Sequence, residues 1–281
     1  MSEQRTPPGW ADRERVRRWI EGARQRESQM TPISDELFAA ATLQPGETLL
    51  DVGVGTGPST NRAASAVGPS GRVVGTDISP VMIEAARSTA VPGVEWLVAD
   101  AQTYDFGEGT FDAVISRFGV MFFPDPVAAF ANLGRATRAG GRLAMAVWQT
   151  RDKVPLFDLP YSAAAAVLDE LGLPYQPVAA DEHQCSLGTP ERVASVLVPA
   201  GWQDVETRPT SRVIRLNGER TPADAAADSL DIGPIRELMA GRPPEVRDAV
   251  RERLATAYEP LFDGTGVAVP GGFMIVTARR P

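Results

Sequence analysis

Cysteine, histidine and lysine, which often take part in metal, redox and phosphate sites, are almost missing from this chain of 281 residues. It has one cysteine (Cys185), one histidine (His183) and one lysine (Lys153). A single cysteine excludes an intramolecular disulfide and a zinc site made of cysteines. Because no histidines and acids cluster at metal-ligand spacing either, we expect no bound metal.

Long apolar runs and an excess of positive charge are missing as well. No apolar run reaches the roughly 18 residues that a membrane-spanning helix needs, and the first eight residues contain no apolar signal core. The net charge of −8 gives no overall positive field to hold a nucleic acid backbone. The one arginine-rich stretch, residues 13–26, is interleaved with acids and is typical of a solvated helix face. We expect a cytoplasmic protein, a monomer or homodimer, that acts on neither nucleic acid nor membrane.

Short apolar segments alternate with helical segments from residue 48 to residue 148. Hydrophobic residues make up 43% of the chain, which is enough for a sizeable core. Proline just inside and glycine just after the helical segments mark their ends. This alternation predicts a parallel β-sheet with helices on both faces. The expected strands are Thr48–Val52, Arg72–Asp77, Val94–Ala99, Phe111–Ser116 and Arg142–Trp148.

The segments on either side of this region are mostly helical. We expect one N-terminal helix from Trp10 to Gln29, and a second that begins with Thr31 as its cap and Pro32 in its first turn. After residue 148 the alternation breaks. The elements expected there are a helix at Leu156–Leu171, a helix opened by Thr189 and Pro190, a strand at Asp204–Leu216, helices within 221–262 and a last strand at Gly272–Ala278.

The first strand ends in a glycine-rich turn, Asp51-Val52-Gly53-Val54-Gly55-Thr56-Gly57-Pro58. Glycines at alternate positions let the backbone take positive φ angles and approach a ligand closely. The helix that follows points free N–H groups at that ligand. Asp77 ends the next strand, where an acid suits the two hydroxyls of a ribose. The pattern predicts a nucleoside cofactor.

Two details argue against a phosphate group in that cofactor. In the dinucleotide fingerprint the third glycine comes three residues after the second, and Pro58 occupies that position here. Proline also removes an N–H donor that a pyrophosphate would use. The phosphate-binding loop of nucleoside triphosphatases needs a Gly-Lys-Ser/Thr sequence, and no lysine lies nearby. A ligand with ribose and adenine but no phosphate fits better, and S-adenosylmethionine is the usual one.

Five segments, in order, resemble motifs of the class I S-adenosylmethionine-dependent methyltransferases, in particular the ubiquinone/menaquinone-biosynthesis-type branch that acts on small molecules. They are Asp51–Gly57, Thr76–Met82, Val98–Ala101, Phe111–Phe118 and Arg138–Leu143. The resemblance covers about residues 45–148 and the two-strand tail. It implies an α/β fold with a doubly wound, mostly parallel seven-stranded sheet in the order 3-2-1-4-5-7-6. The last strand would be antiparallel, and a helical cap would be added to the helices on both faces.

We expect these parts to form one compact domain. Its parts are residues 1–44 as N-terminal helices over the cofactor site, 45–150 as the cofactor-binding half of the sheet, 151–188 and 221–262 as helical cap and substrate insertions, and 189–220 and 263–281 as the remainder of the sheet.

The resemblance also implies which residues bind the cofactor. Gly53, Gly55 and Gly57 would pass along its methionine part, and Asp51 would meet its ammonium group. Asp77 would accept hydrogen bonds from both ribose hydroxyls, with a helix-capping role as the alternative.

The adenine and the end of the fourth strand involve further residues. Ile78 and Met82 would flank the adenine, although Met82 also suits the helix core. Asp100 and the Ala101 N–H would bind the adenine edge, and the alternative for Asp100 is a local cap. The remaining expected cofactor-binding residues, at the end of the fourth strand, are Ser116, Arg117 and Phe118. Arg117 would pair either with the cofactor carboxylate or with an acid on the cap.

Fewer signals point to the acceptor side. His183 lies beside two acids in the insertion and is the candidate catalytic base, with an exposed loop as the alternative. Trp19, Tyr161 and Tyr175 are candidate residues of the substrate pocket, and for Trp19 helix packing is the alternative.

We therefore expect an enzyme that moves a methyl group from S-adenosylmethionine to a small molecule by in-line displacement, leaving S-adenosylhomocysteine. Secondary or cofactor metabolism is the expected setting. Three alternatives stay open: the same fold and cofactor used for a cyclisation or rearrangement without methyl transfer, a protein that binds the cofactor without turnover, and an NAD-type enzyme.

Overall fold

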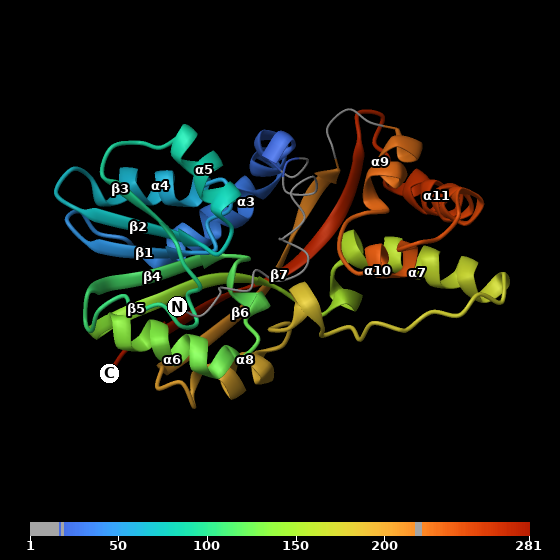
Figure 1. Cartoon of the computed structure of the whole chain (residues 1–281). Helices are drawn as coiled ribbons and strands as arrows, with labels where there is room; N and C mark the ends of the chain where they lie inside the picture. Colours follow the sequence, from blue (N-terminus) through green and yellow to red (C-terminus); the bar gives the residue numbers. More distant parts are fainter. Residues whose placement is uncertain (1–16, 18–19, 217–220) are drawn as a thin grey trace. The chain divides into compact units, whose positions relative to one another are not determined.

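Seven strands form one sheet in the order β3-β2-β1-β4-β5-β7-β6 in the computed structural model, which confirms the predicted order. The structure describes residue 17, residues 20–216 and residues 221–281, and Figure 1 shows the course of the chain. The strands are β1 (Thr48–Val52), β2 (Arg72–Asp77), β3 (Val94–Val98), β4 (Phe111–Arg117), β5 (Thr137–Trp148), β6 (Gln203–Leu216) and β7 (Val267–Arg279).

The first five strands pair in parallel, and β7 is antiparallel to its neighbours β5 and β6. Hydrogen bonds between β5 and β7 show the direction. The Gly140 N–H donates to the Arg280 carbonyl at 2.9 Å, and the Gln149 N–H donates to the Gly272 carbonyl at 3.1 Å. Residue numbers rise along β5 while they fall along β7, so the predicted antiparallel last strand is confirmed.

Proline stands in the first turn of the helices that follow β1, β2 and β4, as the sequence predicts. These helices are α4 (Pro58–Val67), α5 (Pro80–Ser88) and α6 (Pro126–Ala136). The residue before each proline is the N-cap. The Asp125 carboxylate accepts the Ala128 N–H at 3.0 Å, which satisfies one of the free donors at the start of α6.

Of the other helices whose bounds the structure describes, one precedes β1, and the rest lie between β5 and β6 or between β6 and β7. They are α3 (Ala23–Ala41), α7 (Pro155–Glu170), α8 (Pro190–Leu197), α9 (Pro222–Ser229), α10 (Ile235–Met239) and α11 (Pro244–Tyr258), with short 3₁₀ turns η1 (Val120–Phe122), η2 (Arg151–Lys153), η3 (His183–Cys185) and η4 (Glu259–Leu261). Thr221 and Asp224 form a capping box at the start of α9.

The predicted helix boundary at Thr31 is wrong, because α3 runs without interruption through Pro32. The Thr31 hydroxyl donates to the Glu27 carbonyl at 3.0 Å, which is a bond of a helix interior and not of a cap. Proline inside a helix costs a hydrogen bond. Burial offsets that cost, since Ile33 and Leu37 are fully buried on the same helix.

The fifth strand begins earlier than its predicted start at Arg142. β5 begins at Thr137, and its register with β4 shifts between Phe111 and Ala113. Gly140 has a φ of +73° within this bulge. The strand continues through this bulge to Trp148.

The chain divides into two compact units. Of the described residues, unit 1 comprises those within 1–147, 189–208 and 274–281, and unit 2 comprises those within 148–188 and 209–273. The helical segments of unit 2 have a core of their own. That core includes Tyr161, Leu168, Ile235, Leu238 and Val250, all buried.

The parallel strands of unit 1 bring several strand ends to one edge. Val52 pairs with Thr76, and Asp77 pairs with Val98, so β1, β2 and β3 finish side by side. The sheet order reverses between β1 and β4, the position where open α/β sheets bind ligands beyond their carboxyl ends. The predicted cofactor residues therefore gather at this edge.

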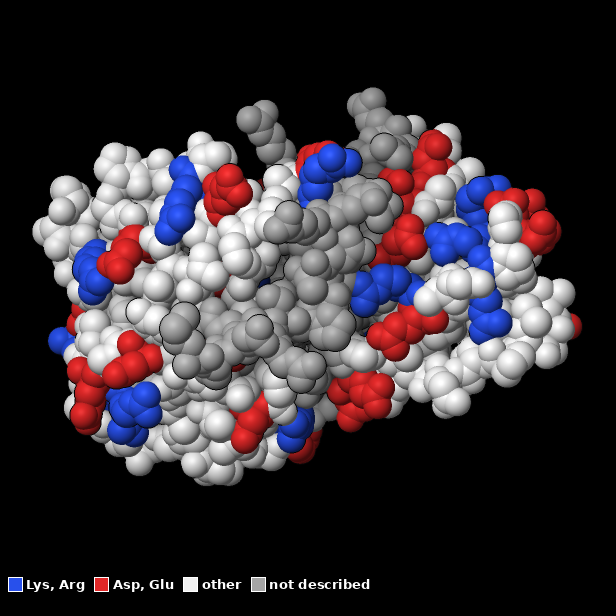
Figure 2. Space-filling model, viewed as in Figure 1, with Lys and Arg blue, Asp and Glu red and all other residues white. Residues whose placement is uncertain are grey.

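The described surface carries charges of both signs. Acidic and basic side chains are interspersed on the face shown in Figure 2. Within the described residues, none of the helices combines the length and apolarity needed to cross a membrane.

Candidate functional site

The glycine turn after β1 has the backbone conformation that its sequence predicts. Gly53, Gly55 and Gly57 have φ angles of +72°, +55° and +86°. A Cβ at Gly53 would lie 2.5 Å from the Cα of Gly119, and one at Gly57 would lie 2.5 Å from the Trp96 ring. A Cβ at Gly55 would meet nothing within 4 Å. Gly53 and Gly57 are thus packed closely against Gly119 and Trp96, whereas Gly55 faces open space.

Asp51 is a fully buried carboxylate just before this turn. Its Oδ2 accepts hydrogen bonds from Ser59 and Thr60, each at 2.7 Å, in the first turn of α4. Its Oδ1 is buried and has no partner. Burial raises the pKa of Asp51 to about 6, although the two hydroxyls and the nearby Arg117 oppose the shift. The carboxylate is thus short of one partner, and a cationic group would supply it.

Asp77 connects the end of β2 to the glycine turn. Its Oδ2 accepts the Gly55 N–H and its Oδ1 accepts the Ser79 N–H, both at 2.9 Å. Burial raises its pKa, and these backbone N–H groups oppose the shift. A carboxylate offers about four acceptor positions, so each oxygen keeps capacity for one more donor. The helix-capping alternative does not apply, because the side chain that caps α5 is that of Ser79, which accepts the Met82 N–H.

Asp100 and Ala101 follow β3 at the same edge. Asp100 is partly exposed, and its Oδ1 accepts the Gln102 N–H at 2.9 Å, which is the local cap that the sequence left open. Ala101 is buried, and its carbonyl accepts a hydrogen bond from Asn132 at 3.0 Å.

The two residues expected to flank an adenine differ in exposure. Ile78 is partly exposed at the end of β2. Met82 is only 2% exposed and lies in α5 among the core residues of unit 1. The helix-core alternative therefore describes Met82 in this structure.

The end of β4 closes against the glycine turn. The buried Ser116 hydroxyl donates to the Val52 carbonyl at 2.7 Å and accepts the Gly119 N–H at 3.2 Å. Phe118 has a φ of +62°, which is strained for a residue with a side chain. A Cβ at Gly119 would lie 2.5 Å from the Val52 carbonyl oxygen. Ser116 thus ties the two turns together.

Arg117 pairs with an acid of the N-terminal helix, one of the two roles expected for it. Its guanidinium donates to both carboxylate oxygens of Glu27, at 2.8 and 2.6 Å, and to the Ser34 hydroxyl at 2.6 Å.

Sequence reasoning missed three residues of this site. Glu27 lies 90 positions before its partner Arg117, so no local pattern connects them. Gly119 follows the recognised β4 segment directly, and its lack of a side chain was the available signal. Trp96 lies on β3 at 9% exposure, and its indole N–H is buried without a partner.

The candidates on the acceptor side that the structure describes belong to unit 2. Tyr161 is buried; its hydroxyl accepts the Val178 N–H at 2.9 Å, and the Arg151 guanidinium lies 3.7 Å from its ring centre. Tyr175 is partly exposed. Trp19 lies outside the described residues.

His183 lies in an exposed turn of unit 2. Its Nε2 is 3.2 Å from the Glu237 carboxylate, and 43% of its side chain is exposed. Its φ is +52°. The exposed-loop alternative matches these features. Cys185, two residues on, is a free and buried thiol whose pKa burial raises to about 12.

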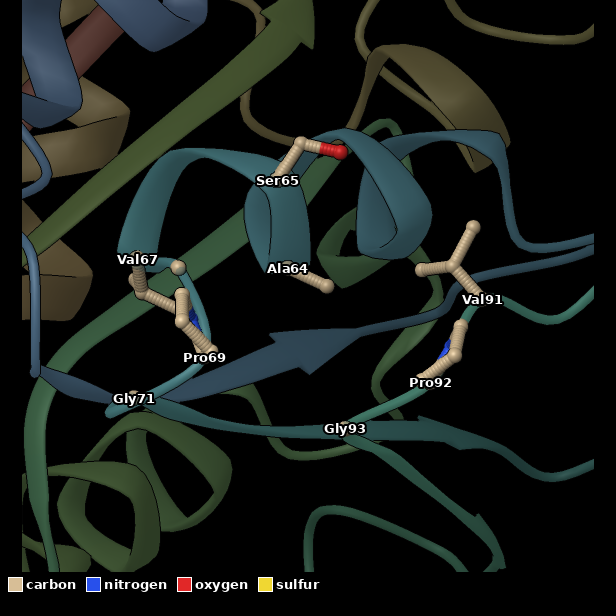
Figure 3. Close-up of a pocket in the computed structure, with 9 residues that line it drawn as sticks. Ala64, Ser65, Val67, Pro69, Gly71, Val91, Pro92 and Gly93 are labelled. Carbon is tan, nitrogen blue, oxygen red and sulfur yellow. The ribbon is translucent and has the colours of Figure 1, made fainter.

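A surface pocket of unit 1 lies at the opposite end of the strands. It is lined by small and apolar residues of α4 and of the loops before β2 and β3 (Figure 3): Ala64, Ser65, Val67, Gly68, Pro69, Gly71, Val91, Pro92 and Gly93. None of these is charged.

Among the described residues there is also no group of three or more metal-ligating side chains.

Residues 49–141 match the family model described as a methyltransferase domain. This segment contains the glycine turn, Asp77, Asp100 and the end of β4. Aklanonic acid methyltransferase of a Streptomyces species is 38% identical over 118 residues, which are 41% of this chain and 54% of that protein. The matched regions cover 32 to 54% of the curated relatives, so the chain spans about half of their length or less.

Solved structures share the fold over most of the chain. A Bacillus halodurans protein regarded as a methyltransferase has a TM-score of 0.56 at 20% identity, over 88% of this chain and 98% of that one. Phosphoethanolamine N-methyltransferase 2 of Haemonchus contortus, solved with phosphomonomethylethanolamine and S-adenosylhomocysteine, has a TM-score of 0.56 at 16% identity, over 93% and 57%. At these identities the likeness establishes the fold.

Proposed function

We propose that this chain, which contains a methyltransferase domain of the class I S-adenosylmethionine-dependent family at residues 49–141, transfers a methyl group from S-adenosylmethionine to a small molecule. One observation carries the proposal. The buried Oδ1 of Asp51 lacks a partner beside a glycine turn that faces open space at Gly55. A ligand with a cationic group would satisfy the first and fill the second.

The residues of the edge fit the parts of S-adenosylmethionine. Asp51 would hold its ammonium group. Asp77 has acceptor capacity left on both oxygens for the ribose hydroxyls. Asp100 and the Ala101 N–H would bind the adenine edge, beside the partly exposed Ile78. The glycine turn would let the methionine part pass close to the backbone.

The cofactor supplies a methyl group that its positive sulfur already activates for transfer. The work of this chain is then to orient and to exclude water. Holding the acceptor atom, the methyl carbon and the sulfur in line could contribute about 7–11 kcal/mol through proximity. Asp51 would hold the ammonium group and Asp77 the ribose, which lie on either side of the sulfur, so together they would orient the methyl group.

The acceptor is proposed to be a small molecule of secondary or cofactor metabolism. The 38% identity to aklanonic acid methyltransferase supports this class. Tyr161 and Tyr175 stay predictions as substrate contacts. His183 stays a prediction as a base, a role that matters only if the acceptor must lose a proton.

A labelled cofactor tests the proposal. The purified chain is incubated with S-adenosylmethionine carrying a labelled methyl group and a panel of small aromatic and aliphatic acceptors. We expect label in a small-molecule product and an equal amount of S-adenosylhomocysteine. Binding without label transfer would favour a cyclase, a rearrangement or a binding protein. Failure to bind the cofactor would refute the proposal.

A further inference from the structure

A largely buried ion pair joins α3 to the end of β4 in unit 1. Arg117 is 13% exposed and Glu27 is 33% exposed. Glu27 and Ser34 are seven residues apart, which is two turns of α3, so both face the same guanidinium. The Ser34 hydroxyl donates to the Met30 carbonyl at 3.1 Å, which leaves its oxygen free to accept from Arg117. The arginine is thus held by three hydrogen bonds from one helix.

The same arginine lies close to a second carboxylate, that of Asp51. Asp51 pairs with Ile115 in the parallel register of β1 and β4. Side chains two residues apart on a strand point to the same face, so Arg117 projects from the face that carries Asp51. Its positive charge acts on Asp51, since it lowers the pKa of that carboxyl against the effect of burial. Arg117 therefore has two acids within its field, and it binds one of them.

We propose that Glu27 is a positioning residue for the cofactor site: it holds Arg117 away from Asp51 and so keeps Asp51 available for the ammonium group of the cofactor. This inference rests on the proposed function. It assigns Arg117 a role different from a direct contact with the cofactor carboxylate.

A buried charge without a partner is costly in a folded protein. If Glu27 lost its charge, the Arg117 guanidinium would be left poorly compensated in a largely buried position, which is costly. The unpartnered Oδ1 of Asp51 is an open acceptor on the same sheet face. A salt bridge to it would relieve both groups. The cofactor ammonium would then have to compete with a tethered arginine for one carboxylate.

A simpler account is that the ion pair only stabilises the packing of α3 on the sheet. We call this the strut account. The two accounts differ in what happens when both charges are removed. For a strut, loss of either partner breaks the contact, and the double variant is no better than the single ones. For charge competition, removing Arg117 also removes the competitor, so the double variant recovers.

The experiment compares Glu27→Gln, Arg117→Gln and the double variant of the full chain. The dissociation constants of S-adenosylmethionine and S-adenosylhomocysteine are measured by titration calorimetry, and circular dichroism and thermal unfolding monitor folding. Asp35→Asn is the matched control, because Asp35 fastens the same helix to Arg62 of α4 at 2.7 Å through exposed side chains.

We expect Glu27→Gln to raise both dissociation constants about tenfold or more. Arg117→Gln and the double variant should agree with each other within about threefold, and both should bind more tightly than Glu27→Gln. Asp35→Asn should bind like the wild type. Glu27→Asp, which keeps the charge, should restore most of the affinity.

Equal weakening in Glu27→Gln, Arg117→Gln and the double variant would establish the strut and overturn the proposal. Weaker binding by Arg117→Gln than by Glu27→Gln would show a direct arginine contact to the cofactor and would also overturn it. If Glu27→Gln does not fold, Ser34→Ala removes one of the three bonds and should raise the dissociation constants by a few fold. An unchanged value there would count against the proposal. A wild type that binds no cofactor would instead refute the proposed function.

Discussion

The buried Asp51 should make this protein less stable at neutral pH than it is without that charge. An aspartate in an unfolded chain has a pKa near 3.9, and burial raises the pKa of Asp51 in the folded chain to about 6. Between these values the folded chain holds a proton that the unfolded chain has lost. Stability therefore falls as the pH rises from about 4 to about 6, and the full penalty is present above that range.

The magnitude follows from the difference of about two pKa units. At 1.36 kcal/mol per unit, ionised Asp51 costs about 3 kcal/mol of folding free energy at pH 8. Asp51→Asn removes the charge but keeps an acceptor for the Ser59 and Thr60 hydroxyls. We expect the variant to be more stable than the wild type by about 1 to 3 kcal/mol at pH 8, where the lower value allows for weaker hydrogen bonds to an amide.

Urea unfolding at pH 4, 5, 6 and 8 measures this effect. The advantage of Asp51→Asn should be small at pH 4, grow through pH 5 and 6, and level off by pH 8. Asp125→Asn is the control, because it exchanges an exposed N-cap for another good one and should leave stability unchanged at every pH. Equal stabilities of wild type and Asp51→Asn at pH 8 would show that the ionised Asp51 carboxylate does not destabilise the folded chain.

Three further predictions concern the same unit and the histidine. Cofactor affinity should fall about tenfold per pH unit below about pH 6, as Asp51 takes up the proton it must lose to bind a cation, and Asp51→Asn should abolish this dependence; titrations at pH 5 and 8 measure it. Gly53→Ala should lower the melting temperature much more than Gly55→Ala, because only the first places a Cβ against Gly119; similar melting temperatures would contradict the geometry. If His183 is the base, His183→Ala slows turnover by about 100- to 10,000-fold with an unchanged cofactor dissociation constant, and unchanged turnover removes it from the reaction.

Local signals in the sequence were sufficient for the sheet and its turns. Proline marks the starts of α4, α5 and α6, glycine marks the end of α4, and alternate glycines encode the positive φ angles after β1. Asp77 could be placed at the strand edge because it directly ends an apolar run. Each of these features depends on residues that are neighbours in the chain.

Features that depend on distant contacts could not be predicted. Pro32 suggested a helix start, but tertiary burial of Ile33 and Leu37 keeps the helix continuous. The partner of Arg117 comes from a helix far away in the sequence. Trp96 limits the space at Gly57 through an approach between strand β3 and the start of α4. In each case packing between elements decides, and one sequence carries no local trace of it.

Calorimetric titration of wild type and Asp77→Ala measures whether S-adenosylmethionine binds at the glycine turn. We predict one cofactor per wild-type chain and an affinity at least about tenfold lower for Asp77→Ala, since the ribose loses a charged acceptor. Circular dichroism should show that both proteins are folded. No binding by the wild type, or equal binding by a folded Asp77→Ala, would contradict binding of the cofactor at this turn.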